Sequence, residues 1–229
     1  MGLLCKEQFP SSQRRGIGIG EPVPEDLPIY SESILRTRLQ FEDLERLKGI
    51  DTTSVWEKSD KFIEQFEGAI DARRARESLT GLTKPNLLRA HAILFGGRED
   101  AGLLRRGSLN PLYRGQDCPA PQFIDRSLQN FFNWLSAESV SEIHPIERAA
   151  LVLTRIADIW PFEFGNLTVA LVCGNMCLGQ AGFAPFFFPP EHAKEFNTAV
   201  AQAMVIETQP LVNAIYKTVK REMLALVPR

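Results

Sequence analysis

Two strongly apolar segments joined by one short loop constrain the fold more than any other feature of the sequence. Residues 146–159 carry few polar side chains, and residues 166–178 carry no charged one. Segments of this length and composition are typical of helices that are buried on nearly all sides. The intervening loop, residues 160–165, contains a proline and ends in a glycine, which stops the first helix. We therefore expect two central helices that meet at this loop.

Helical patterning also covers most of the remaining chain, from about Ser33 onwards. A helix that starts at Ser54, with Glu57 completing a capping box, is expected to run towards Ile70. Another follows Thr83 and has a proline in its first turn. The other expected helices cover residues 34–49, 123–135, 191–205 and 208–226. The sequence thus predicts an all-α fold.

Glycine and proline divide the chain into three parts. Residues 1–30 are expected to form an irregular N-terminal arm, residues 31–80 the N-terminal helices, and residues 81–229 a core with C-terminal helices. Inside that core, residues 96–121 are rich in glycine and proline and are expected to form a long loop with a short β-hairpin. Loops of this length in compact domains usually serve a function.

Charge and cysteine content exclude several classes of function. A formal net charge of −2 provides no electrostatic surface for nucleic acid or for an anionic membrane, and no apolar run approaches the length of a membrane span. Cys173 and Cys177 have no accompanying cysteine or histidine pair, so we expect free thiols packed as small apolar groups and no metal site. Free thiols and the absence of a signal peptide favour a reducing, cytoplasmic setting. No feature indicates a particular oligomeric state.

Gly165 and Asn166 open the second central helix. The first backbone N–H groups of a helix lack partners within it, and the positive end of the helix dipole lies there, so Gly165, Asn166 and Leu167 are candidates for binding an anion such as phosphate. The alternative is structural: Gly165 makes the turn and Asn166 caps a core helix. Local sequence leaves both interpretations open.

Four separated stretches resemble the core of the Fic (Fido) family. They are His144–Ala150 with its His-Pro start, Trp160–Asn166, Ala101–Arg105 and the helix entry from Pro119 to Leu135, and the similarity covers about residues 80–180. Members of this family transfer AMP, or another phosphate-containing group, from a nucleotide to protein hydroxyls. The resemblance implies a Fic-like helical bundle with a short β-hairpin flap.

The central motif departs from the family pattern at its reactive positions. Where the family has a histidine that acts as general base, this chain has Trp160, whose indole cannot accept a proton. The family's Mg²⁺-binding acidic residue is replaced by Phe164, its second glycine by Leu167, and its phosphate-binding arginine by Thr168. The motif positions that match the family are Phe162, Gly165 and Asn166.

These departures support a main hypothesis of a catalytically impaired Fic-fold protein that acts as a binding or regulatory module without a cofactor. Loss of a positioned general base alone typically costs about 10²–10⁴-fold in rate. The alternative is an active transferase that uses ATP and Mg²⁺, with Glu163 or His144 replacing the missing groups. A third hypothesis is a structural helical protein whose resemblance is accidental.

The resemblance also suggests roles for two further segments. Residues 107–119 correspond to the family's flap, which holds target peptides by strand addition, so Leu112, Tyr113 and Arg114 are candidates for binding a protein or peptide target. Phe66-Glu67-Gly68 resembles the end of the family's inhibitory helix, whose glutamate engages the phosphate-binding arginine. Because Thr168 replaces that arginine, we expect Glu67 to have no partner and to be structural. We also expect structural roles for His91, His144 and His192.

Overall fold

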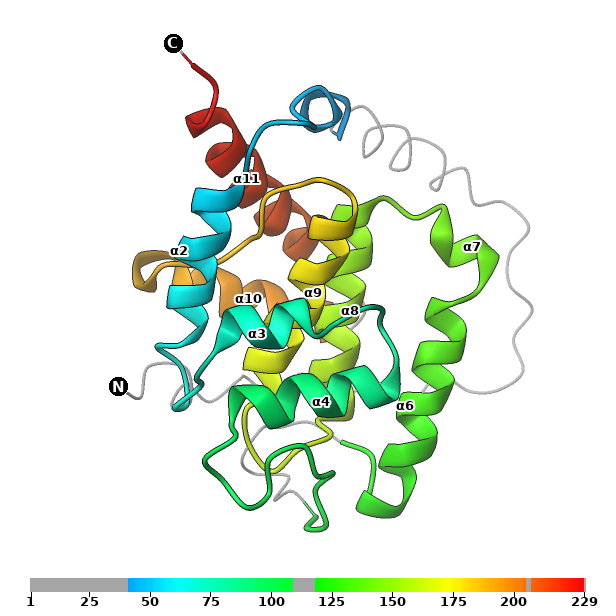
Figure 1. Cartoon of the computed structure of the whole chain (residues 1–229). Coiled ribbons are helices and arrows are strands. Elements are labelled where there is room, and N and C mark those ends of the chain that lie inside the picture. Colours follow the sequence, from blue (N-terminus) through cyan, green and yellow to red (C-terminus); the bar gives the residue numbers. More distant parts are fainter. Residues whose placement is uncertain (1–40, 109–117, 205–206, 229) are drawn as a thin grey trace, which may run out of the picture.

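A computed structural model describes residues 41–108, 118–204 and 207–228 of the chain (Figure 1). These residues form helices and contain no strand, so the predicted all-α fold is confirmed. The helices are α2 (Thr53–Ile63), α3 (Ala72–Glu77), α4 (Lys84–Leu94), α6 (Pro121–Leu135), α7 (Glu138–Ser141), α8 (Pro145–Ile159), α9 (Asn166–Gln180), the 3₁₀ turn η1 (Pro190–His192), α10 (Ala193–Met204) and α11 (Gln209–Ala225). The expected N-terminal arm and the tip of the expected hairpin lie outside the described residues.

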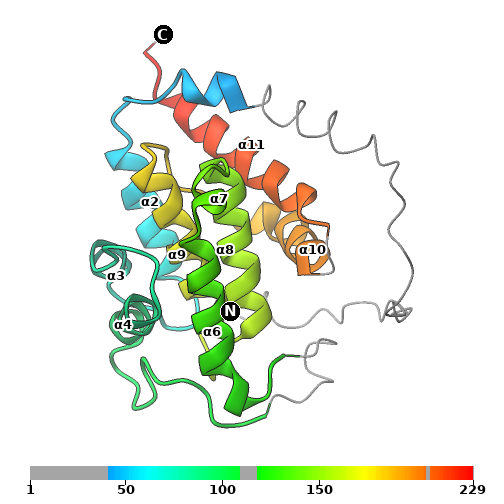
Figure 2. The same ribbon diagram turned by 90° about the vertical axis from the view of Figure 1, so that its right-hand side faces the viewer.

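Helices α8 and α9 form the centre of the fold, as the sequence predicts. They run side by side, with α2, α3 and α4 packed against α9 and with α10 and α11 packed against α8 (Figures 1 and 2). Gly174 allows their close approach, because a Cβ atom there would lie 3.2 Å from the carbonyl oxygen of Ala149. Cys173 and Cys177 are buried in this core, and burial raises the pKa of both thiols, as expected of unreactive apolar groups.

The expected helix from Ser54 to Ile70 is wrong at both ends. It begins at Thr53 without a capping box, and the carboxylate of Asp51 accepts hydrogen bonds from the backbone N–H and the hydroxyl of Thr53. It ends at Ile63, and the separate helix α3 follows. The chain turns between α2 and α3 at Glu67, whose φ angle of 51° lies in the left-handed region. An α-helix cannot continue through that conformation.

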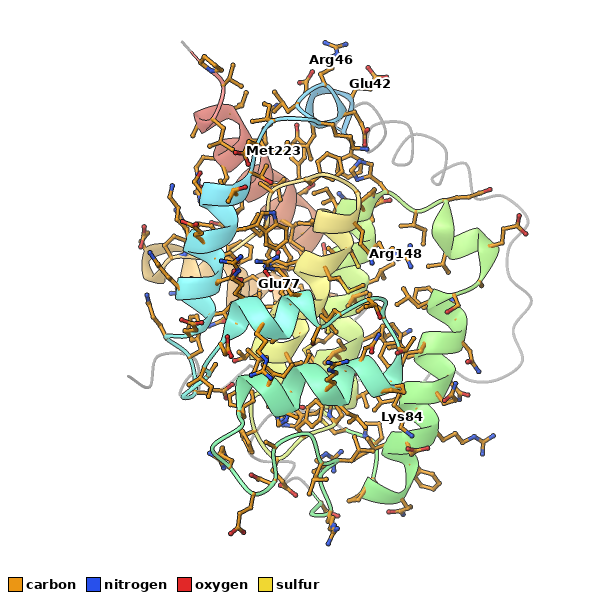
Figure 3. The ribbon with its side chains drawn as sticks, in the orientation of Figure 1. Glu42, Arg46, Glu77, Lys84, Arg148 and Met223 are labelled. Atoms are coloured by element: carbon orange, nitrogen blue, oxygen red, sulfur yellow. The ribbon has the colours of Figure 1, made fainter. Side chains whose placement is uncertain are left out.

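Helix α6 covers the side of α8 that α10 and α11 leave open, and it also contacts α4. Lys84, at the start of α4, lies beside α6 and pairs with Asp125 (Figure 3). No helix among the described residues is long and apolar enough to cross a membrane.

Candidate functional site

The loop between α8 and α9, residues 160–165, is closed by two left-handed residues. Trp160 ends α8 with φ 48° and ψ 63°, and Gly165 precedes α9 with φ 69°. Asn166 is fully buried and does not cap the helix with its side chain. Its side-chain oxygen accepts from the N–H of Phe162 at 2.8 Å, and its side-chain nitrogen donates to the Phe162 carbonyl at 2.9 Å. The Asn166 amide therefore holds the loop together through both of its polar atoms.

His91 of α4 packs against the loop. Its imidazole stacks on the ring of Phe162, with 3.8 Å between ring centroids and 13° between planes. Its Nδ1 accepts from the N–H of Gly102 at 2.8 Å, so its Nε2 carries the proton and donates to the Phe164 carbonyl at 3.1 Å. Burial holds the pKa of His91 down to about 4. His91 is therefore neutral and structural, in agreement with expectation.

Acidification is expected to destabilise the protein through His91. The unfolded imidazole takes up a proton near pH 6.5 and the folded one only near a pKa of about 4, so the unfolded state binds more protons between these values. The free energy of unfolding should fall as the pH falls through this window, by about 3 kcal/mol for a shift of this size. Urea unfolding measured across the window checks this, with His91→Gln as the control. A pH dependence that is the same in both proteins would contradict it.

Arg105 joins the loop to the two ends of the segment that the sequence assigns to the flap. Its side chain is only 3% exposed, and it pairs with no carboxylate among the residues that the structure describes. Nε donates to the carbonyl of Trp160 at 2.7 Å, Nη1 to that of Gly107 at 3.0 Å, and Nη2 to that of Pro119. The Arg105 N–H also donates to the Pro161 carbonyl at 2.8 Å. One buried guanidinium thus holds residues 107 and 119 against the loop.

Glu163 also binds the backbone that follows Arg105. Its Oε1 accepts from the backbone N–H groups of Arg106 and Gly107, each at 3.2 Å. The Glu163 carboxylate is therefore directed at the 106–107 backbone, and Thr168 in the first turn of α9 bonds elsewhere, to Glu67. This arrangement gives Glu163 a structural task and does not favour it as a replacement metal ligand.

Phe164 lies between an aromatic ring and a cation. The guanidinium carbon of Arg98 is 3.5 Å from the centroid of the Phe164 ring, and Phe95 meets the same ring edge-on at 4.9 Å. Phe95 also covers Gly165, because a Cβ atom at Gly165 would lie 2.2 Å from that ring. The aromatic ring of Phe95 and the exposed guanidinium of Arg98 therefore lie next to the two residues that precede α9.

Glu67 does have a partner, so the expectation that it has none is wrong. The hydroxyl of Thr168 donates to its Oε2 at 2.9 Å, across 101 residues of sequence. The left-handed turn after α2 brings Glu67 to α9, which no local pattern reveals. Threonine thus keeps the contact, by a single hydrogen bond, at the position where the resemblance implies an arginine.

His144 lies too far from the loop to act in catalysis there, so its suggested catalytic role is wrong. It precedes α8, whose 15 residues span about 22 Å, whereas the loop follows the other end of that helix. Its Nδ1 accepts from the N–H of Ile146, its Nε2 contacts Glu45 at 3.1 Å, and its ring stacks on Phe41. His144 is a helix-capping residue.

The remaining candidates are placed only in part. Leu112, Tyr113 and Arg114 lie outside the described residues. Leu167 is partly buried in the first turn of α9. Among the described residues, no group of three or more His, Cys, Asp or Glu side chains could hold a metal ion. Sequence reasoning noted Arg105 as a motif position without finding its contacts, and it missed Arg98 altogether.

Comparisons with known proteins agree with this geometry. Residues 81–178 match the model of the Fic/DOC family. The chain is 28% identical over 135 residues to "Protein adenylyltransferase fic-1" of Caenorhabditis elegans, which covers 58% of this chain and 26% of that protein. The match to "Protein adenylyltransferase Fic" of Drosophila erecta is also 28%, over 137 residues, 58% of this chain and 27% of that protein. The chain thus matches about a quarter of the length of these relatives.

Solved structures show the same fold. C. elegans Fic-1 superposes with a TM-score of 0.69 at 17% identity, over 86% of this chain and 73% of that chain. IbpAFic2, in a structure described as covalently tethered to Cdc42, superposes with a TM-score of 0.60 at 17% identity, over 82% of this chain and 70% of that chain. Identities this low support a shared fold and carry no further conclusion.

Proposed function

Because residues 81–178 belong to the Fic/DOC family, we propose that this protein is a Fic-fold binding or regulatory module that does not transfer AMP. The relatives named above are protein adenylyltransferases, so the parent chemistry is nucleotide transfer to protein. One observation carries the proposal: the side chains of Asn166, Glu163 and Thr168 bond to other parts of the protein. Asn166 bonds to Phe162, Glu163 to the 106–107 backbone and Thr168 to Glu67.

A general base is the first requirement of hydroxyl transfer, and the loop has no histidine for this role. The indole of Trp160 cannot accept a proton. His91 is close to the loop, but both of its ring nitrogens are engaged and its pKa is held at about 4. His144 lies at the far end of α8. The loop does carry the carboxylate of Glu163, but its Oε1 already accepts from the N–H groups of Arg106 and Gly107.

Protein binding is the function that we propose for the backbone beside the loop, because such binding needs no reactive side chain. Arg105 and Glu163 hold residues 106–107 and 119 beside the loop through backbone groups. Binding by strand addition uses backbone hydrogen bonds and needs no catalytic group. The partner surface that we propose is the flap segment, with Leu112, Tyr113 and Arg114.

Transfer is tested by incubating the protein with radiolabelled ATP, Mg²⁺ and cell lysate, with C. elegans Fic-1 as a positive control. We expect no labelled protein with this chain. Labelling that disappears in Glu163→Ala would instead establish an active transferase with non-standard residues, and would overturn the proposal.

Binding is tested separately, with any partner isolated on the immobilised protein. We expect retention of the partner to be lost when residues 109–117 are replaced by a Gly-Ser linker of equal length. The melting temperature of that variant should match the natural protein. A partner that binds the linker variant equally well would show that the flap segment is not the binding surface.

A further inference from the structure

We infer that two charged side chains of this chain, a cation and an anion, lie where its relatives' motif would hold a metal ion and a nucleotide phosphate, and that the site therefore rejects Mg²⁺–nucleotide. The cation is the guanidinium of Arg98, which lies on the ring of Phe164, and the anion is the carboxylate of Glu67, which accepts from Thr168. This inference rests on the proposed function, because it uses the same assignment of the loop. It goes further by naming which side chains exclude the ligand.

The cation follows from the surroundings of Phe164, which occupies the position of the motif's metal-binding acid. A hard divalent cation requires oxygen ligands, and a phenyl ring offers none. A phenyl face does attract a guanidinium, and Arg98 lies 3.5 Å above it. The carboxylate of Asp100 contacts Arg98 at 3.4 Å and helps to keep it there. Any Mg²⁺ brought to Phe164 would meet the positive charge of Arg98 and no carboxylate on the ring.

The anion follows from the position of Thr168, the third residue of α9. The positive end of the α9 dipole favours a negative group at this point. The carboxylate of Glu67 already lies there, 2.9 Å from the Thr168 hydroxyl. A phosphate would therefore encounter a like charge. Glu67 holds this position through a left-handed backbone conformation, with φ 51°, that a non-glycine residue adopts only when its surroundings enforce it.

The space next to these two charges is filled as well. The ring of Phe95 lies so close to Gly165 that even a methyl group would not fit. The residues present therefore do not fit the metal and nucleotide that the family implies. Phe164 and Thr168 stand where the family has an acid and an arginine. Each of them contacts a charged side chain from elsewhere in the chain, Arg98 and Glu67 respectively.

The first test is calorimetric titration of the natural protein with Mg²⁺ alone, ATP alone and Mg²⁺–ATP at millimolar concentration. We expect no binding heat and no change in melting temperature with any of them. Saturable binding of Mg²⁺–ATP would overturn the inference. It would leave the proposed function intact if no label is transferred, so the two can fail separately.

The second test asks whether Arg98 is the excluding cation. Phe164→Asp should pair with Arg98 and gain no affinity for Mg²⁺, whereas Phe164→Asp with Arg98→Ala should bind Mg²⁺ at least about tenfold more tightly. The matched control is Phe164→Asp with Arg89→Ala, because Arg89 is an exposed arginine of α4 that does not contact Phe164. Equal Mg²⁺ affinity of Phe164→Asp with and without Arg98 would overturn the assignment.

Discussion

Replacing Gly165 with alanine is expected to destabilise this protein strongly. The new Cβ atom would lie 2.2 and 2.4 Å from two carbons of the Phe95 ring, and the residue would keep a φ angle of 69° that suits glycine. Overpacking of a core typically costs about 1–3 kcal/mol, and a side chain in the left-handed region adds about 1–2 kcal/mol. We expect the free energy of unfolding to fall by about 3–5 kcal/mol, which urea unfolding measures directly.

Gly182→Ala provides the matched control, because Gly182 also has a positive φ, of 80°, but has open space around it. Only the backbone term of about 1–2 kcal/mol should appear there. Adding Phe95→Leu to Gly165→Ala should recover part of the loss, because the smaller side chain removes the overlap. If the two alanine variants lost equal stability, the contact between Phe95 and Gly165 would not be as close as described.

Replacing Arg105 with alanine is expected to have the second largest effect. Its side chain satisfies the carbonyls of Trp160, Gly107 and Pro119, and all three would lose a charged donor. Hydrogen bonds to charged groups contribute about 1.5–3 kcal/mol each, and water would recover part of this at the loop ends, so we expect a loss of about 3–5 kcal/mol. Urea unfolding measures the loss, and amide hydrogen exchange at residues 105–107 should quicken.

The neighbouring Arg106 supplies the control, because only its backbone N–H takes part in the contact and its side chain is exposed. Arg106→Ala should stay within about 0.5 kcal/mol of the natural protein. Arg105→Lys should fall between the two, since one ammonium group cannot reach three separated carbonyls. A loss from Arg106→Ala as large as that from Arg105→Ala would show that the buried hydrogen bonds of Arg105 do not carry the stability.

The sequence predicted those features that depend on local periodicity. The apolar segments 146–159 and 166–178 became α8 and α9 almost residue for residue, because an apolar helix of this length has only the core in which to lie. Thr83 caps α4 as expected, with its hydroxyl accepting from Asn86. The predicted capping box at Ser54 failed because the helix begins one residue earlier, at Thr53, so Ser54 lies inside its first turn.

The predictions that failed at the site depend on the placement of residues that are distant in sequence. Glu67 meets Thr168 across 101 residues, although it was expected to have no partner. His144 shares a motif with the loop in sequence, yet the length of α8 separates the two in space. No pattern within a window of a few turns contains this information.

The sequence and the tertiary structure therefore determine different properties of the 160–168 loop. The sequence by itself determined which reactive atoms are missing, because an indole, a phenyl ring and a threonine hydroxyl cannot act as base, metal ligand and phosphate clamp whatever the fold. Only the tertiary structure decided what replaced them: Arg98 on Phe164, Glu67 on Thr168, and Phe95 against Gly165. The physical reason is that chemical identity belongs to single residues, whereas occupancy of a site depends on which distant side chains the packed helices bring to it.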